Sequence, residues 1–191
     1  MFRYYKLLLI FCALMLPSAW AFSQSNVAVM EAGRSKTELS PYVKYLHDPD
    51  SQMDKVQIFD LAKANKFKPL PNGNATFGFS KGTYWFHTYL FNQDSTEQRW
   101  LLVLQYPLLD NVDVYLRYPD NHIEHFTSGD MQPFSARAIR YRQPNFWIDL
   151  PQKTQVELLV STSSKSSIQA PLAVYTASAF AEMERDAQFG I

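Results

Sequence analysis

Short apolar runs separated by polar turn residues dominate this chain. The strongest run is residues 83–91 (TYWFHTYLF), in which both alternating sets of side chains are bulky. Tyr84, Phe86 and Leu90 would share one face of a strand, with Trp85, Tyr89 and Phe91 on the other. A strand that is apolar on both faces predicts a central, buried position. Residues 100–105 (WLLVLQ) predict a second strand of this kind.

Residues 112–118 alternate more regularly, with Val112, Val114, Leu116 and Tyr118 on one face. This pattern predicts a half-exposed antiparallel strand. Further short strands are predicted at residues 41–46, 123–126, 145–150, 155–162 and 172–176. Some eight or nine short strands, separated by turns rich in Pro, Asn and Asp, indicate an all-β sandwich. We expect a jelly-roll-like antiparallel β-sandwich, because central strands apolar on both faces are hard to reconcile with one open sheet.

Two segments have helical rather than strand character. Residues 57–66 predict one or two helical turns. Residues 178–188 (SAFAEMERDAQ) predict a short C-terminal helix, with Ser178 as N-cap and Phe180, Met183 and Ala187 at helical spacing. We therefore divide the chain into a leader at 1–21, an N-terminal segment at 22–39, the sandwich domain at 40–177 and a C-terminal helix at 178–191.

The first 21 residues predict a secretory signal peptide. A short basic segment precedes the apolar run at residues 7–16, and Ala19 and Ala21 form an A-x-A cleavage pattern. The rival interpretation is an uncleaved anchor, but the run of about ten residues is shorter than the roughly 20 that span a membrane. Cys12, the only cysteine, would leave with the signal. The exported domain would then rely on its core and hydrogen bonds, without an internal disulfide.

The net charge and the absence of catalytic motifs exclude several classes of function. Loss of Arg3 and Lys6 lowers the Lys and Arg count from 18 to 16 against 18 acidic residues, a net charge of about −2. We therefore expect no nucleic-acid partner and no cofactor. The chain has no G-x-S-x-G or H-E-x-x-H motif, and we expect no enzymatic activity. His122 and His125 would point to opposite faces of a strand, so no metal site is predicted.

Three arginines form the main candidate for ligand binding. Arg137, Arg140 and Arg142 follow a Gly129-Asp130 turn and precede the apolar residues 146–148. A guanidinium suits carboxylates, phosphates and sugar hydroxyls. Arg140 and Arg142 would share one face of an unbroken strand, whereas Arg137 joins them only across a bulge. The alternative, at even weight, is ion pairing with Asp110, Asp113 or Asp149.

Aromatic side chains would complete such a site, since a sugar ring stacks on an aromatic platform. The predicted ligand-binding residues are Arg137, Arg140, Arg142, Asp110, Trp85, Tyr106 and Trp147. The opposing interpretation is that the tryptophans belong to the core and that Asp110 caps a turn.

Four segments together resemble a known family. They are Phe77-Gly78-Phe79 with 82–86, residues 106–115 (YPLLDNVDVY), Gly129-Asp130 with 133–137, and Pro171-Leu172. From about Ser40 onward, the chain is similar to the second type of extracellular sensor domain of bacterial seven-transmembrane receptors with diverse intracellular signalling modules (7TMR-DISM extracellular 2). His87 stands where this family often carries Arg.

The resemblance implies a jelly-roll domain, similar to carbohydrate-binding modules, that lies outside the inner membrane. In the family, seven helices follow and lead to a diguanylate cyclase, a histidine kinase or a related output. The chain ends where the first of these helices is expected, as in a truncated receptor or a free-standing sensor. We therefore expect a non-catalytic periplasmic sensing domain, attached natively to the inner membrane through downstream helices.

The expected ligand is a sugar, a sugar acid or another small anion. Two alternatives from other classes remain open. One is a secreted β-sandwich hydrolase acting on carbohydrates. The other is a domain that binds a protein, for example another receptor ectodomain, through an exposed sheet edge.

Overall fold

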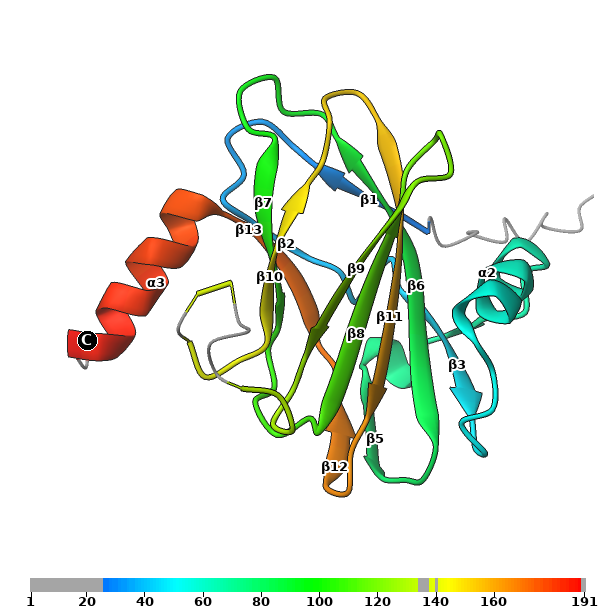
Figure 1. Cartoon of the computed structure of the whole chain (residues 1–191). Helices are drawn as coiled ribbons and strands as arrows, with labels where there is room; N and C mark the ends of the chain where they lie inside the picture. Colours follow the sequence, from blue (N-terminus) through cyan, green and yellow to red (C-terminus); the bar gives the residue numbers. More distant parts are fainter. Residues whose placement is uncertain (1–25, 134–137, 140, 190–191) are drawn as a thin grey trace, which may run out of the picture.

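The computed structural model describes residues 26–133, 138–139 and 141–189. The predicted signal peptide at 1–21 lies outside the described residues, as do Arg137 and Arg140. The described chain confirms the predicted fold class, an antiparallel β-sandwich with a short C-terminal helix (Figure 1). The larger sheet contains β1 (Val27–Met30), β3 (Lys44–Asp48), β4 (Lys68–Pro69), β6 (Thr83–Asn92), β8 (Asn111–Arg117), β9 (Ile123–Ser128) and β11 (Gln155–Ser163).

The smaller sheet has four strands in the order β10-β7-β13-β2. These are β2 (Lys36–Glu38), β7 (Arg99–Leu104), β10 (Asn145–Asp149) and β13 (Leu172–Thr176). A two-stranded ribbon joins β5 (Thr76–Phe79) to β12 (Ser167–Gln169). The larger sheet has the order β4-β3-β6-β11-β8-β9, and β1 pairs with β6 as its only parallel neighbour among the described strands.

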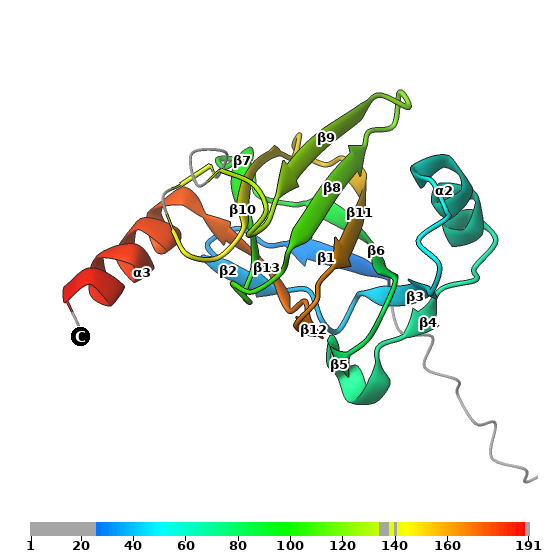
Figure 2. The same ribbon diagram turned by 60° about the horizontal axis from the view of Figure 1, so that its bottom comes forward.

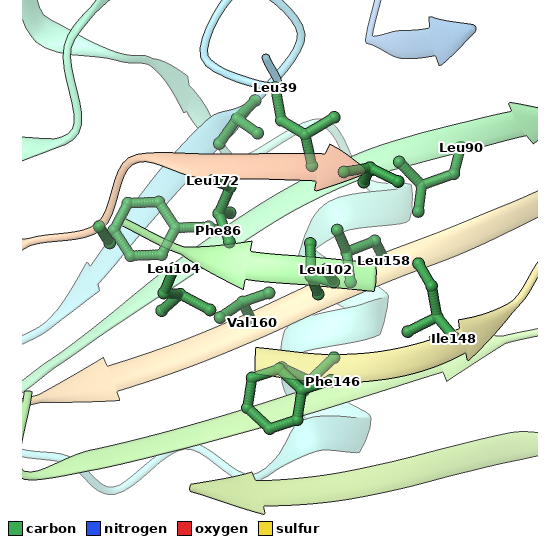
Figure 3. Packing of buried hydrophobic residues seen from close by; sticks show 14 of the residues in the cluster. Leu39, Phe86, Leu90, Leu102, Leu104, Phe146, Ile148, Leu158, Val160 and Leu172 are labelled. Atoms are coloured by element: carbon green, nitrogen blue, oxygen red, sulfur yellow. The ribbon is translucent and has the colours of Figure 1, made fainter. Parts of the chain in front are cut away.

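The core fills the space between the two larger sheets. Figure 3 shows Phe86 and Val160 of the larger sheet packed with Leu102 and Phe146 of the smaller one. The predicted alternation is confirmed in β6, where Tyr84, Phe86 and Leu90 belong to this core cluster and Trp85 belongs to a separate one. It is confirmed in β8 as well, because Val112, Val114 and Leu116 are fully buried.

Two helices cover the outer faces of the sandwich and lie on opposite sides of it (Figure 2). Helix α2 (Lys55–Lys63) packs Ile58 and Phe59 against Trp85 and Leu159 of the larger sheet. It begins two residues before the predicted segment because Asp54 forms a capping box with Gln57.

Helix α3 (Ala177–Phe189) packs Phe180 against Leu101, Val103 and Tyr175 of the smaller sheet. The predicted N-cap, Ser178, lies inside this helix instead. The helix starts one residue earlier, and the Thr176 hydroxyl accepts a hydrogen bond from the Ala179 amide at 3.3 Å. Thr176 therefore takes the capping role that the sequence assigned to Ser178.

Candidate functional site

Loops at one end of the sandwich form the walls of an open groove of about 620 Å³, which we call the loop-end groove. Three adjacent strands of the larger sheet have their ends here: β6 begins at Thr83, β8 begins at Asn111 and β11 ends at Ser163. The ribbon of β5 and β12 lies at the same end (Figure 1). The groove is lined by Ser51, Phe79, Ser80, Lys81, Gly82, Asp110, Asn111, Ser163, Ser164 and Lys165.

Two glycines bring the loops of this end into close backbone contact. Gly82 has a φ of +87°, and an ideal Cβ there would lie 2.3 Å from the Asp48 carbonyl oxygen. Gly129 has a φ of +128°, and its Cβ would lie 2.3 Å from the Asp110 carbonyl oxygen. A side chain fits at neither position, so the Gly82-Thr83 and Gly129-Asp130 motifs have a structural reason.

Hydrogen bonds tie the same loops together. The Asp110 carboxylate accepts a bond from the backbone N–H of Lys165 at 2.7 Å. The Ser166 hydroxyl donates to the Leu108 carbonyl at 2.8 Å, and the Met131 N–H donates to the Asp110 carbonyl at 3.2 Å. Asp110 therefore holds the loops after β7, β9 and β11 in fixed positions, which preorganises the groove walls.

The groove surface combines an aromatic face with positive charge. Phe79 is 85% exposed, the most accessible of the large hydrophobic side chains in the described part of the chain. Lys81 and Lys165 are exposed, and neither ammonium forms an ion pair within residues 26–133, 138–139 and 141–189. Among the described residues that line the groove, Asp110 is the only acidic one, so this lining carries a net positive charge. Such a surface suits a ligand with an apolar face and an anionic group.

The predicted site residues occupy different parts of the molecule. Asp110 lies in the loop-end groove, where its carboxylate accepts the backbone N–H of Lys165 from another loop. Trp85 is buried beneath α2, with only 5% of its surface exposed. Trp147 is half-buried on the outer face of the smaller sheet, with the Arg99 guanidinium 5.2 Å from its ring centroid. Tyr106 is half-buried against the main core.

The arginine segment forms a loop where it is described. Arg142 is exposed and lies between β9 and β10, and residues 138–139 and 141–144 contain no strand. The shared face predicted for Arg140 and Arg142 assumed an unbroken strand. With Arg137 and Arg140 outside the described residues, the role of the three arginines stays a prediction.

Sequence reasoning did not single out Phe79, Lys81 or Lys165 as site residues. Phe79 lies in one of the family-like segments, and Lys165 lies in a Ser-rich loop, so the sequence held some indication that these two residues could belong to a site. The missing information was spatial, because β5 and β12 pair only in the folded chain and bring Phe79 beside Ser167.

The histidines considered for metal binding have other contacts. His125 lies on the outer face of the larger sheet and is 2.8 Å from the Asp113 carboxylate, whereas His122 stacks on Tyr118. Within the residues that the structure describes, no three His, Cys, Asp or Glu side chains are grouped as metal ligands. None of the helices described here is long and apolar enough to cross a membrane.

Fold and groove together define a class, the antiparallel β-sandwich domain with a groove between the loops at one end. The family model described as 7TMR-DISM extracellular 2 matches residues 40–176, so the chain belongs to this family. The predicted resemblance is thereby confirmed. The matched region includes β3 to β13 and ends just before α3. A search of curated proteins found no match.

Membership defines the general role of the chain as an extracellular sensor domain of a membrane receptor, which implies export. The family is one of receptor sensor domains and is not a known enzyme family. The described parts of the family-like segments contribute to the loop-end structure or lead from it: two segments line the groove, Gly129 contacts Asp110, and Leu172 begins β13.

Proposed function

We propose that this domain senses a small acidic carbohydrate, such as a sugar acid, in the loop-end groove. It acts by binding and not by turnover, and occupancy of the groove alters the conformational preference of α3. The observation that carries the proposal is the exposed side chain of Phe79 in one groove with two lysines that form no ion pair with any residue the structure describes.

Phe79 supplies the platform for the ligand. An aromatic ring left 85% exposed does not contribute to the core, and its place is set by the pairing of β5 with β12. The C–H face of a pyranose ring can cover such a surface and remove it from water. Burial of the ring is worth about 25 cal/mol for each Å² of apolar surface covered.

Lys81 and Lys165 supply the charge that selects an acid. Their ammonium groups offer three donors each to a carboxylate, and hydroxyls of the groove serines can bond to sugar hydroxyls. Because the two lysines belong to different loops, a bound carboxylate would bridge the loop before β6 and the loop after β11.

The groove has a short covalent route to α3. The loop with Lys165 runs directly into β12, then β13, and β13 ends at Thr176 beside the first residue of α3. A ligand shifts the position of α3 only if it binds one conformation of this route better than the other. The relay and the ligand class are both part of the proposal.

A thermal-shift screen of residues 22–191 against sugars, uronic acids, peptides and small anions tests it. A uronic acid should raise the melting temperature, with about 2.7 kcal/mol of added stability at a hundredfold excess over its Kd. Phe79→Ala and the double variant Lys81→Ala/Lys165→Ala should lose the shift. Lys66→Ala, an exposed lysine outside the groove, is the matched control.

Binding by the Lys81→Ala/Lys165→Ala variant at wild-type affinity would overturn the groove assignment. Product formation on a polysaccharide panel would contradict a binding-only role. The arginine prediction has its own test. Arg140→Ala/Arg142→Ala should abolish binding if that segment contacts the ligand, and should leave the affinity unchanged if it does not.

One observation favours a second candidate, recognition of a protein. Leu108 and Met131 are exposed by 51% and 71%, and both adjoin Asp110 at the same end as Phe79. Together with Phe79, these two side chains place three exposed apolar groups near one groove. Such a surface also suits contact with a protein partner, such as another receptor ectodomain. This alternative would be favoured if no small molecule in the screen raised the melting temperature and sedimentation detected self-association of the domain.

A further inference from the structure

A second groove, of about 570 Å³, lies at the opposite end of β8 and β11, between these strands and α2. We call it the helix-side groove. Its walls include Asp60 and Lys63 of α2, Tyr89 of β6, Arg117 of β8, and Gln155 and Glu157 of β11. It shares no lining residue with the loop-end groove.

A buried charged network forms the floor of this groove. Glu157 is only 6% exposed, and its carboxylate is 2.8 Å from His87 Nε2. The other oxygen of Glu157 accepts bonds from Nε and Nη2 of Arg117, at 2.8 and 2.5 Å. The Arg117 guanidinium also lies 4.2 Å from the Phe59 ring centroid. Two hydrogen bonds and an aromatic ring thus fix the plane of the guanidinium.

Arg117 still has binding capacity on its open side. Its side chain is 28% exposed, and among the described residues no hydrogen bond engages Nη1. The edge of the guanidinium that carries Nη1 therefore remains available to an acceptor. Because the other edge is already held, a ligand would not have to order this side chain.

The rest of the wall offers both signs of charge. Asp60 and Lys63 are three residues apart on α2 and so occupy neighbouring positions on one helix face. Both are exposed, and within the part of the chain that the structure describes neither forms an ion pair. The side chains of Tyr89 and Gln155 add further polar groups to the lining of this groove.

From this arrangement we propose that the helix-side groove binds a zwitterionic small molecule, such as a free α-amino acid. Its carboxylate bonds to Arg117 and Lys63, and its ammonium group bonds to Asp60. A simple anion would leave Asp60 unpaired and a simple cation would leave Lys63 unpaired, whereas a zwitterion satisfies both. This site is independent of the function proposed for the loop-end groove.

Titration calorimetry with the common L-amino acids, each in turn, tests the proposal on residues 22–191. The strongest binder is then compared with its N-acetyl and carboxamide derivatives. Each derivative lacks one of the two charges, and each should bind at least about tenfold more weakly, as expected for a lost charge-assisted hydrogen bond.

Variants then locate the site. Asp60→Asn and Lys63→Ala are exposed substitutions that leave the Glu157 network intact, and each should weaken the same amino acid by at least about tenfold. Lys66→Ala, just beyond α2, is the matched control, and Lys81→Ala/Lys165→Ala reports separately on the other groove.

Absence of binding by any amino acid would overturn the proposal. So would equal binding of either blocked derivative, or wild-type affinity in Asp60→Asn or Lys63→Ala. Failure of the loop-end proposal would leave these results unchanged, because its variants lie at the opposite end of the sheet.

Discussion

Gly129 lies so close to Asp110 that an ideal Cβ on the glycine would be 2.3 Å from the aspartate carbonyl oxygen. Asp110 in turn binds the Lys165 backbone N–H with its carboxylate. The loops after β7, β9 and β11 are therefore coupled through one residue, and the walls of the loop-end groove depend on a position that accepts only glycine.

Gly129→Ala should destabilise the domain and distort the groove. The methyl group cannot avoid backbone atoms, so loops must move, at a cost of about 1–3 kcal/mol for overpacking in addition to the backbone strain. Urea unfolding measures the change. Gly33→Ala is the matched control, because Gly33 also has a positive φ, of +76°, but an added Cβ would meet nothing within 4 Å.

Gly33→Ala should cost only the left-handed backbone penalty, about 1–2 kcal/mol. If the two variants are equally stable, the close approach of Gly129 to Asp110 does not determine the loop structure.

The buried network should make stability depend on acid. Burial by itself would raise the pKa of Glu157, but hydrogen bonds and charge from His87 and Arg117 outweigh it and hold the pKa below its usual value of 4.5. A carboxyl whose pKa is lowered by folding contributes stability that is present above the unfolded pKa. That contribution is lost as the pH falls through the folded pKa.

Stability measured by urea unfolding should therefore decline as the pH drops below about 4.5. Glu157→Gln should remove part of this dependence and should also destabilise the protein at neutral pH, because Arg117 loses the carboxylate that neutralises its charge. Asp60→Asn, at the exposed rim of the same groove, is the control. An unchanged acid profile in Glu157→Gln would show that the network does not govern acid sensitivity.

Helix α3 should detach when its main anchor is removed. Phe180 is 0% exposed, and its ring meets those of Tyr141 and Tyr175 edge-on, with centroids 5.2 and 5.8 Å away. Phe180→Ala should forfeit up to about 3–5 kcal/mol of docking energy. Hydrogen exchange should then show lost protection in α3, with the strands still protected.

Phe79→Ala is the matched control for this experiment, because the same substitution at an exposed ring should change stability by less than about 0.5 kcal/mol. Full protection of α3 in Phe180→Ala would mean that other contacts anchor the helix.

Local sequence patterns predicted the sandwich well because the order of apolar and polar residues in each strand reflects which of its faces are buried. Alternation in residues 112–118 and bulky side chains on both faces of residues 83–91 specify which strands are central. The same patterns could not show what covers an outer face. Trp85 therefore suited either a ligand platform or a core, and the structure packs it against Phe59 of α2.

The candidate site was harder to predict because its parts are distant in sequence. Asp110 was selected as a possible polar group for a ligand, with turn capping as the opposing interpretation. Lys81 and Lys165 come from different loops, and only the order β6-β11-β8 places those loops at one end. Nothing in a linear pattern distinguishes an exposed lysine beside a groove from any other exposed lysine.

The most direct test of the central claim is a ¹⁵N-resolved NMR titration of residues 22–191 with glucuronate. Chemical-shift changes are expected at Lys81, Gly82, Asn111 and residues 163–165, followed by smaller changes through β13 into α3. Changes confined to the surroundings of Trp147 or α2, or none at saturating glucuronate, would contradict the assignment of the loop-end groove as the sensing site.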